Sequence, residues 1–258
     1  MTTEEQNAEP KVLILTPVKS AAHHLQRYVE LIERLDWPRD RLSVALLEGD
    51  STDDTLAVAD RLLPRLAART RRAGLFHKDF GFSMPPGIPR WAPPFQLLRR
   101  QVLARARNHL LFRALDDEDW VLWIDVDVID YAADIIGQLL ATRFDIVVPH
   151  CVTQPGGTSF DWNSWAGDGS VRLSDRRGAG AVRLDAVGGA MLLVRADLHR
   201  DGLIFPPFPY GVESPRIRKH HPVWGRAEIE TEGLGSMAGD MGIQCWGLPD
   251  LEIIHARE

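Results

Sequence analysis

Apolar runs alternate along the first part of the chain with segments in which apolar residues recur every three or four positions. The short apolar runs, rich in Val, Leu and Ile, predict strands at residues 11–17, 41–48, 75–80, 120–129 and 144–151. The segments with helical spacing predict helices at residues 21–35, 53–66, 95–115 and 134–142. This alternation predicts an α/β fold, in which helices cover both faces of a mostly parallel sheet.

The pattern changes after Cys151. Residues 153–180 are polar, rich in glycine and almost aperiodic, and residues 205–224 form a second long loop with several prolines. Long irregular segments in compact domains are usually functional. Between and after these loops, we expect a bent strand or a strand pair at 182–195, a helix at 234–241 and closing apolar segments at residues 245–247 and 251–255.

Residues 120–129 are almost wholly apolar except for Asp125 and Asp127. Residues i and i+2 of a strand point to the same side, so the two carboxylates should project together near the carboxyl end, where open α/β sheets bind ligands. Adjacent carboxylates repel unless a cation lies beside them, and a divalent metal carrying a polyphosphate would meet that need. The alternative is a strand that ends at Asp125, with both aspartates in the following turn.

Composition narrows the class of protein. The 258 residues have ordinary apolar content, and no linker-like shift in composition divides them, which favours one domain over residues 11–258. Residues 1–10 are polar and acidic, and we expect them to be disordered. A net charge of −6 argues against a nucleic-acid partner, and two cysteines suggest neither a disulfide framework nor a zinc cluster. Because the sequence shows no membrane span and no signal peptide, we expect a soluble, cytoplasmic protein.

Nine segments in chain order resemble a known family. They are TP (16–17), GDSTDDT (49–55), ARARN (104–108), DWVLWIDVDV (119–128), DIVVP (145–149), FDWNSW (160–165), VGGAMLLVRADLHRDGL (187–203), TEGLGSMA (231–238) and WGLPDLEIIHA (246–256). Together they resemble glycosyltransferase family 62, the fungal mannan-polymerase α-mannosyltransferases. The chain departs from that family by lacking its N-terminal anchor and stem, and the charged motif expected in the loop at 81–94.

The resemblance implies a GT-A fold, which is Rossmann-like with a mostly parallel mixed central sheet. Residues 11–128 would form the nucleotide-binding half and residues 129–258 the acceptor-binding half. It also implies a GDP-mannose donor, a manganese-type metal and transfer with retention of the α configuration.

The resemblance assigns the metal site to Asp125, Asp127 and His255. One carboxylate would bind the ion, and the other would contact the ribose or a metal-bound water. His255 would add a ligand from the C-terminal end of the chain. Oxygen ligands suit Mg²⁺ or Mn²⁺, and one imidazole among them favours Mn²⁺.

The nucleotide pocket is assigned to Asp50 and Asp53 with Thr16 and Pro17. A carboxylate here could accept both N–H groups of guanine. The alternative is that GDSTDDT is only an acidic first turn of a helix, which favours the helix dipole.

The helix predicted at 95–115 carries several arginines. The resemblance suggests that Arg107 and Asn108 contact the diphosphate or the ribose. Arg99 and Arg100 are interpreted as solvated helix residues.

The polar loop contributes Asp161, Asn163 and Trp165 to the expected sugar site. Tryptophan faces pack well against pyranose C–H bonds, although the tryptophans could instead pin the loop to the core. Gly188 and Gly189 would let the backbone approach the donor sugar, or would form a simple β-bulge.

Acidic residues also precede the last predicted helix. Glu230 and Glu232 suit a helix N-terminus for capping reasons alone, whereas the resemblance implies that one of them hydrogen-bonds the acceptor hydroxyl. A retaining transferase needs either a carboxylate nucleophile, for which Asp161 is the candidate, or a same-face attack without one.

The sequence therefore predicts a metal-dependent retaining glycosyltransferase. It would transfer α-mannose from GDP-mannose to a sugar hydroxyl of a glycan or glycoside, held between the loops at 153–180 and 205–225. Two alternatives remain open, namely a haloacid-dehalogenase-type phosphatase using Asp125 and Asp127, and a non-catalytic sugar-nucleotide-binding subunit of a larger complex. The sequence predicts neither the acceptor linkage nor the oligomeric state.

Overall fold

The structure is a computed structural model that describes residues 9–85, 87–88, 92–167, 169–211 and 228–257. Most of the segment expected to be disordered (1–10), and most of the proline-rich loop at 205–224, therefore lie outside the described residues. Among the described residues, no helix combines the length and the apolar character that crossing a bilayer would require.

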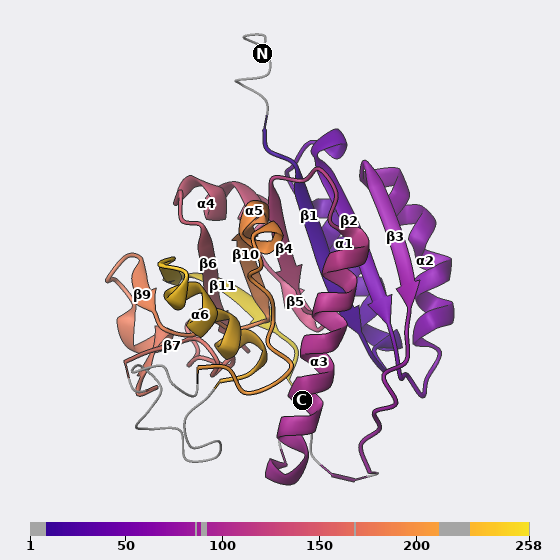
Figure 1. Ribbon diagram of the computed structural model, residues 1–258. Coiled ribbons are helices and arrows are strands. Elements are labelled where there is room, and N and C mark those ends of the chain that lie inside the picture. Colours follow the sequence, from indigo (N-terminus) through magenta and orange to yellow (C-terminus); the bar gives the residue numbers. More distant parts are fainter. Residues whose placement is uncertain (1–8, 86, 89–91, 168, 212–227, 258) are drawn as a thin grey trace.

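A mixed sheet runs through the molecule (Figure 1). Its strands in spatial order are β3 (Arg72–His77), β2 (Leu42–Glu48), β1 (Val12–Val18), β4 (Trp120–Ile124), β10 (Met191–Arg195), β6 (Ile146–Val152), β11 (Cys245–His255) and β5 (Val128–Asp130), while β9 (Val182–Leu184) also pairs with β11. Strands β3, β2, β1 and β4 are parallel, and β10 is antiparallel to both of its neighbours. The predicted α/β fold with a mixed central sheet is confirmed.

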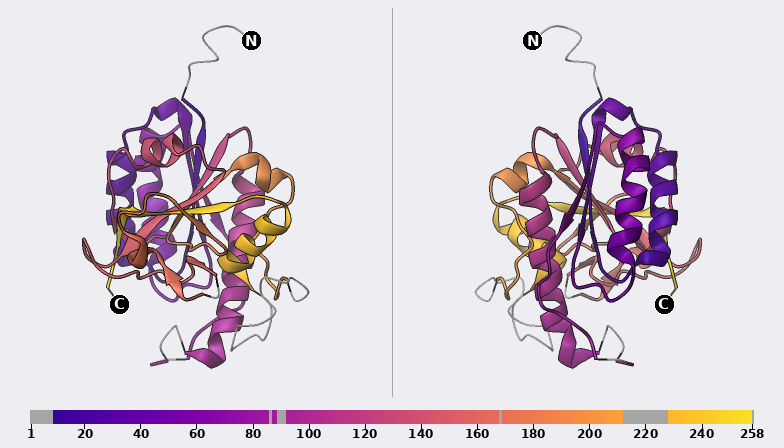
Figure 2. Two further views of the ribbon diagram at one scale, coloured as in Figure 1. Left: turned by 90° about the vertical axis from the view of Figure 1, so that its left-hand side faces the viewer. Right: turned by 90° about the vertical axis from the view of Figure 1, so that its right-hand side faces the viewer.

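Helices cover both faces of this sheet (Figure 2). On one face lie α1 (Ala22–Arg34), α2 (Thr55–Arg69) and α4 (Ile135–Ala141), and on the other lie α3 (Pro93–Ala114), α5 (Ala196–Arg200) and α6 (Glu230–Asp240). In β1, Val12 and Ile14 belong to the first layer of core residues, whereas Leu13 and Leu15 belong to the second. A strand covered on both sides must be apolar at every position, which explains the continuous apolar runs.

The loop between β6 and β9 contains a little regular structure. A two-stranded sheet pairs β7 (Trp165–Ala166) with β8 (Val171–Arg172), and a 3₁₀ turn follows at Leu173–Arg176. A further 3₁₀ turn, Arg39–Arg41, precedes β2. The α5 helix and these short elements have no clear period and were not predicted.

Two predicted elements are corrected by the sheet topology. Residues 120–129 are not one strand, because β4 ends at Ile124 and β5 pairs with β11 at another position in the sheet. Residues 182–195 are not a hairpin, because β9 pairs with β11 whereas β10 lies between β4 and β6. In both cases the two parts of the predicted segment pair with different strands.

Candidate functional site

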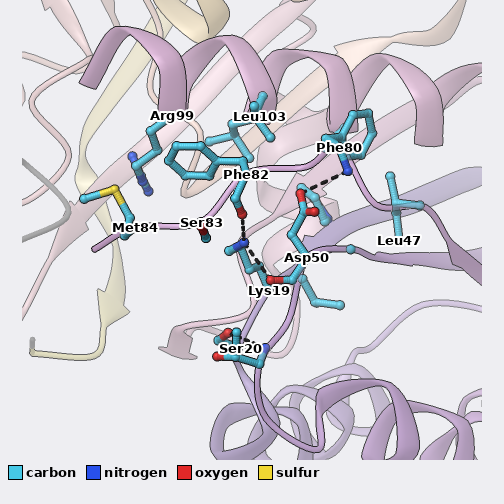
Figure 3. A pocket seen from close by; sticks show the side chains of 16 residues that line it. Lys19, Ser20, Leu47, Asp50, Phe80, Phe82, Ser83, Met84, Arg99 and Leu103 are labelled. Carbon is cyan, nitrogen blue, oxygen red and sulfur yellow. Dashed lines mark hydrogen bonds between the residues drawn. The ribbon is translucent and has the colours of Figure 1, made fainter. Parts of the chain in front are cut away.

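A cavity of about 390 Å³ opens at the carboxyl ends of β1 and β2, beside α3 (Figure 3). The strand ends contribute Pro17, Leu47 and Asp50. The loop that follows β3 contributes Phe80, Phe82, Ser83 and Met84, and α3 contributes Arg99, Val102, Leu103 and Ala106. The cavity is thus walled by apolar and aromatic side chains with a few polar groups, which is the usual character of a small-molecule site.

Asp50 and Lys19 hold the mouth of this cavity together. Asp50 takes a left-handed backbone conformation (φ 57°), and its carboxylate accepts hydrogen bonds from Phe80 N at 3.0 Å and Gly81 N at 2.9 Å. Lys19 Nζ donates to Asp50 O at 2.7 Å and to Phe82 O at 2.6 Å. Figure 3 shows both connections, which fix the loop after β3 over the strand ends.

Thr16 and Asp53 have structural partners instead of facing the cavity. Thr16 is fully buried, and its hydroxyl donates to Ile124 O at 2.7 Å and contacts Tyr28 Oη at 2.9 Å. Asp53 accepts hydrogen bonds from Ala22 N at 3.2 Å and Thr55 N at 3.1 Å. Neither side chain is part of the cavity lining, so nucleotide contacts of Thr16 and Asp53 stay predictions that the cavity does not support. Pro17 and Asp50 do line the cavity.

The turn Asp125–Asp127 lies at the carboxyl end of β4, the strand next to β1. Asp125 N donates to Ala190 O at 2.9 Å, and its carboxylate accepts a hydrogen bond from Arg107 Nη2 at 2.9 Å. Asp127 Oδ1 lies 3.0 Å from His255 Nε2. The two aspartates therefore meet different partners, because they lie in a turn and not at alternate positions of a strand.

Arg107 is a buried link between the acidic turn and α6. Its side chain is 1% exposed, and Nε lies 3.1 Å from Glu230 Oε1. The guanidinium carbon lies 5.5 Å from the Trp123 ring centroid and 5.3 Å from that of Phe205, within the range of cation–π attraction. Such burial favours a role for Arg107 in positioning Asp125, and its contact with diphosphate or ribose stays a prediction.

Asn108 also proves to be structural. Its amide donates to Phe205 O at 2.7 Å and accepts from Phe205 N at 2.9 Å, which closes a pair of hydrogen bonds with one backbone residue. These bonds favour a structural role for Asn108, and its contact with diphosphate or ribose stays a prediction.

Asp161 organises the backbone beside the acidic turn. Its carboxylate accepts hydrogen bonds from Gly189 N at 2.8 Å, Ala190 N at 3.2 Å and Asn163 N at 3.0 Å. A Cβ at Gly188 would lie 2.1 Å from Asp161 Oδ2, and one at Gly189 would lie 2.5 Å from Arg107 Nη2. The two glycines are thus needed because charged side chains approach their backbone closely, and no β-bulge is required to explain them.

A second group of charges lies at the start of α6. Glu232 accepts hydrogen bonds from Trp165 Nε1 at 2.7 Å and from Arg100 Nη1 at 2.7 Å, and Arg100 Nη2 donates to Ile229 O at 2.6 Å. Glu230 takes a left-handed conformation (φ 59°) that turns its side chain back toward Arg107. Arg100 is therefore a buried partner of two glutamates and not a solvated helix residue.

Burial shifts the pKa of several carboxyl groups in this region. It raises the pKa of Asp125 to about 6, against the opposing charge of Arg107 and with the support of Asp127. Burial and the neighbouring Glu232 raise the pKa of Glu228 to about 8, and burial also raises the pKa of Asp161. Although burial lowers the pKa of His255, its hydrogen bond to Asp127 raises that pKa overall.

Two faces of α3 separate the cavity from these charges. Arg99, Val102, Leu103 and Ala106 face the cavity, while Arg100 and Arg107, seven residues apart, face Glu230 and Asp125. Residues spaced by three, four and seven share one side of a helix, and the next residue along is rotated by about 100°. The cavity and the charged group are therefore neighbours across one helix. The spacing of the arginines in the sequence already indicated two faces of this helix. It did not show that one face meets the cavity and the other meets Asp125 and Glu230.

Asp127 and His255 are suitable donors for one divalent cation. His255 Nδ1 lies 2.7 Å from Ala256 O and donates its proton there. Nε2 donates to Asp127 only in the charged ring, and loss of that second proton leaves Nε2 with a lone pair for an ion. Two ligands about 2.1 Å from one ion and at right angles lie about 3.0 Å apart, as these two atoms do. Among the described residues, however, no group of three or more His, Cys, Asp or Glu side chains is gathered for a metal, since Asp125 turns toward Arg107.

The sheet order, with an acidic turn after β4 and a cavity beside it, defines an α/β fold of the GT-A glycosyltransferase type. The mannosyltransferase PcManGT from Pyrobaculum calidifontis, solved in complex with GDP-Man and Mn²⁺, has a TM-score of 0.60 and 19% identity, covering 97% of this chain and 58% of that one. TarS 1-349 of S. aureus, solved with UDP, has a TM-score of 0.56 and 15% identity, covering 96% and 61%. At such identities the likeness establishes the fold.

The sequence profile of the Anp1 family matches residues 1–177 and 169–209, and the chain belongs to that family. It is 30% identical over 305 aligned positions to the mannan polymerase II complex anp1 subunit of Schizosaccharomyces pombe, covering 99% of this chain and 66% of the relative. It is 27% identical over 299 positions to the mannan polymerase complex subunit MNN9 of Candida albicans, covering 98% and 76%. The chain thus spans just under two thirds of the first relative and about three quarters of the second.

Proposed function

We propose that this chain is a metal-dependent retaining glycosyltransferase that transfers α-mannose from GDP-mannose to a sugar hydroxyl of a glycan or glycoside. The observation that carries the proposal is the Asp127–His255 pair at the same sheet edge as the cavity between β1, β2 and α3. The names of the relatives point to mannan, and the mannosyltransferase with the similar fold was solved with GDP-Man and Mn²⁺.

In this proposal Asp127 and His255 hold a Mn²⁺ or Mg²⁺ ion. When bound, such an ion supplies positive charge to the departing nucleoside diphosphate. The backbone carbonyl of Ala256 fixes the His255 tautomer so that Nε2 is available as a ligand. Because imidazole and carboxylate are both present, Mn²⁺ is the better fit.

The remaining acidic residues keep the reaction centre in place. Arg107 forms ion pairs with Asp125 and Glu230 behind the turn, and Arg100 forms ion pairs with Glu230 and Glu232. Asp161 is occupied by three backbone N–H groups, which favours a positioning role over that of a nucleophile. Glu232 would hydrogen-bond the acceptor hydroxyl only through the oxygen lone pairs that Trp165 and Arg100 leave available.

The nucleotide would occupy the cavity of about 390 Å³, with its base near Asp50. The Asp50 oxygens each accept one backbone hydrogen bond, and a carboxylate oxygen can accept a second. Contact between Asp50 and the N–H groups of guanine is therefore compatible with the geometry and forms part of the proposal.

A non-catalytic role is the second candidate. The relatives are named as subunits of complexes, and Asp125 is turned away from the Asp127–His255 pair. A phosphatase of the haloacid-dehalogenase type has lost its support, because the fold is of the GT-A type.

The proposal is tested by thermal unfolding with GDP, UDP or ADP, each with Mn²⁺, Mg²⁺ or EDTA. A ligand at a hundredfold its Kd stabilises the native state by about 2.7 kcal/mol, which raises Tm by a few degrees. We expect a shift with GDP that requires Mn²⁺ and is lost in Asp127→Ala, but is kept in Asp60→Ala, where the carboxylate is exposed on α2.

A rise in Tm with UDP instead of GDP would leave the fold assignment standing and would overturn GDP-mannose as the donor. If Tm does not change with any of the nucleotides in the presence of metal, the proposed transferase function is overturned. Release of GDP from GDP-mannose in the presence of mannotriose then separates the two candidates, since a non-catalytic subunit would bind the donor without turnover.

A further inference from the structure

Trp162 lies in the loop between β6 and β7 with 67% of its surface exposed. The neighbouring Trp165, which the sequence suggested as a sugar platform, is half-buried and uses its indole N–H to bind Glu232. Single exposed apolar residues are common on protein surfaces. The orientation of Trp162 therefore says more about its role than its exposure does.

Three contacts fix that orientation. The indole Nε1 donates to Ser159 O at 3.1 Å, and the guanidinium carbon of Arg172 lies 5.2 Å from the ring centroid. Arg172 Nη1 also donates to the backbone oxygen of Trp162 at 2.5 Å. The ring is thus held in place with a guanidinium against it while most of its surface meets solvent, so little conformational freedom remains to be lost when a ligand binds.

The backbone of Trp162 is anchored to the acidic turn. Asp161, the preceding residue, accepts the N–H of Ala190, and the carbonyl of Ala190 accepts the N–H of Asp125. The loop that carries Trp162 is therefore anchored to the acidic turn through one side chain and one residue of backbone. Its indole lies outside the cavity assigned to the nucleotide, whose lining does not include this loop.

We propose that Trp162 and Arg172 form a subsite for a sugar ring of the acceptor, an inference that rests on the proposed transferase function. The C–H face of a pyranose packs on the flat indole, which is apolar, while the sugar hydroxyls meet polar groups around it. The planar guanidinium beside the ring presents N–H donors that suit such hydroxyls. The relatives are named for mannan, so the ring is a mannose unit of a growing chain.

A sugar fits this place better than a partner protein does. Protein interfaces of useful stability need a large area with an apolar centre. The contacts of Trp162 are a backbone carbonyl and a guanidinium, and its chain neighbours are Asp161 and Asn163. One flat aromatic surface with polar surroundings offers a ring-sized contact and little more.

The test compares Trp162→Ala, Trp162→Phe and the control Phe112→Ala, in which a side chain with the same 67% exposure is removed from α3. Binding of mannotriose is measured by calorimetric titration of the protein loaded with GDP and Mn²⁺. We expect Kd to rise roughly tenfold in Trp162→Ala, because a stacked aromatic contact is lost. The rise should be smaller in Trp162→Phe, which keeps a flat ring, and absent in Phe112→Ala.

The thermal shift produced by GDP and Mn²⁺ is measured on the same variants. It should be unchanged in all of them, which distinguishes loss of the acceptor subsite from collapse of the loop. Unaltered mannotriose binding in Trp162→Ala, or no binding by the wild type while GDP binds normally, would overturn the subsite and leave the transferase standing. If mannotriose binds in a way that depends on Trp162 but GDP and Mn²⁺ give no thermal shift, the sugar subsite stands and the proposed transferase function is overturned.

Discussion

Buried polar side chains in this protein are matched to their partners residue by residue. Arg107 lies between Asp125 and Glu230, and Thr16 closes a contact between Tyr28 and the end of β4. His199 follows the same rule: Nδ1 contacts Leu203 O at 2.6 Å, and Trp123 Nε1 donates to Nε2 at 3.5 Å. The ring is therefore neutral, with its proton on Nδ1.

This arrangement predicts a pH dependence of stability. Burial lowers the pKa of His199 to about 4, from 6.5 in the unfolded chain. As the pH falls through this window, the unfolded state takes up a proton that the folded state refuses, so stability is lost between about pH 6.5 and pH 4. The loss attributable to His199 between pH 7 and pH 5 is about 2 kcal/mol.

Urea unfolding at the two pH values measures this loss. The loss of unfolding free energy between pH 7 and pH 5 should be smaller by about 2 kcal/mol in His199→Phe. It should be unchanged in His23→Phe, where the ring is exposed on α1. An equal loss in both variants would show that other groups carry the pH dependence.

At the scale of elements, α6 is placed by its glycines. The helix starts at Glu230 and contains Gly233 and Gly235, and its early residues are buried against the sheet. A Cβ at Gly235 would lie 2.8 Å from Ala186 Cα and 2.9 Å from Asp185 O. The backbones of α6 and the segment after β9 therefore touch, which fixes where Glu230 and Glu232 stand relative to Gly188 and Gly189.

Gly235→Ala should destabilise the protein by about 1–3 kcal/mol, because backbone atoms cannot move aside as a side chain can. The matched control is Gly137→Ala in α4, where an added Cβ meets nothing within 4 Å. There the substitution should stabilise by about 0.4–1 kcal/mol through helix propensity and a less flexible unfolded chain. Chemical denaturation measures the free energy of unfolding of both variants. Equal changes in the two would contradict the close approach of the two backbones.

For the whole molecule, the sheet separates two layers of core with one cysteine in each. Cys151 on β6 belongs to the layer of α1, α2 and α4, and Cys245 on β11 belongs to the layer of α3, α5 and α6. Neither forms a disulfide, both are buried, and burial raises the pKa of the Cys151 thiol. Because β6 and β11 are paired neighbours, the two cysteines lie on adjacent strands of one sheet that both layers share.

We therefore expect both thiols to resist a thiol reagent in the native state and to react together on unfolding. The reaction is followed by mass spectrometry at increasing urea, and the unfolded fraction is measured by far-UV circular dichroism as a reference. Cys245 labelled at a urea concentration where Cys151 is still protected would show that the layers unfold separately. That result would contradict the prediction of one domain over residues 11–258.

Most of the longer helices and strands of this protein can be predicted from its sequence. Apolar runs and helical spacing depend on neighbours along the chain, so β1, α1, β2, α3 and β6 could be predicted within a few residues. The position of the acidic pair after a buried strand, and the order of nine short motifs, indicated the GT-A fold as well. These features are local or ordered along the chain, and each can be recognised without knowing what lies opposite.

The contacts between distant residues follow from the tertiary structure and not from the sequence pattern. Residues 120–129 divide because β5 pairs with β11, more than a hundred positions away, and Arg100 is buried because α6 packs on α3. Thr16 and Asn108 looked like ligand contacts but satisfy the backbone at Ile124 and Phe205. Side-chain partners are set by strand pairing and helix packing between distant segments, and a pattern read along the chain carries no record of that pairing.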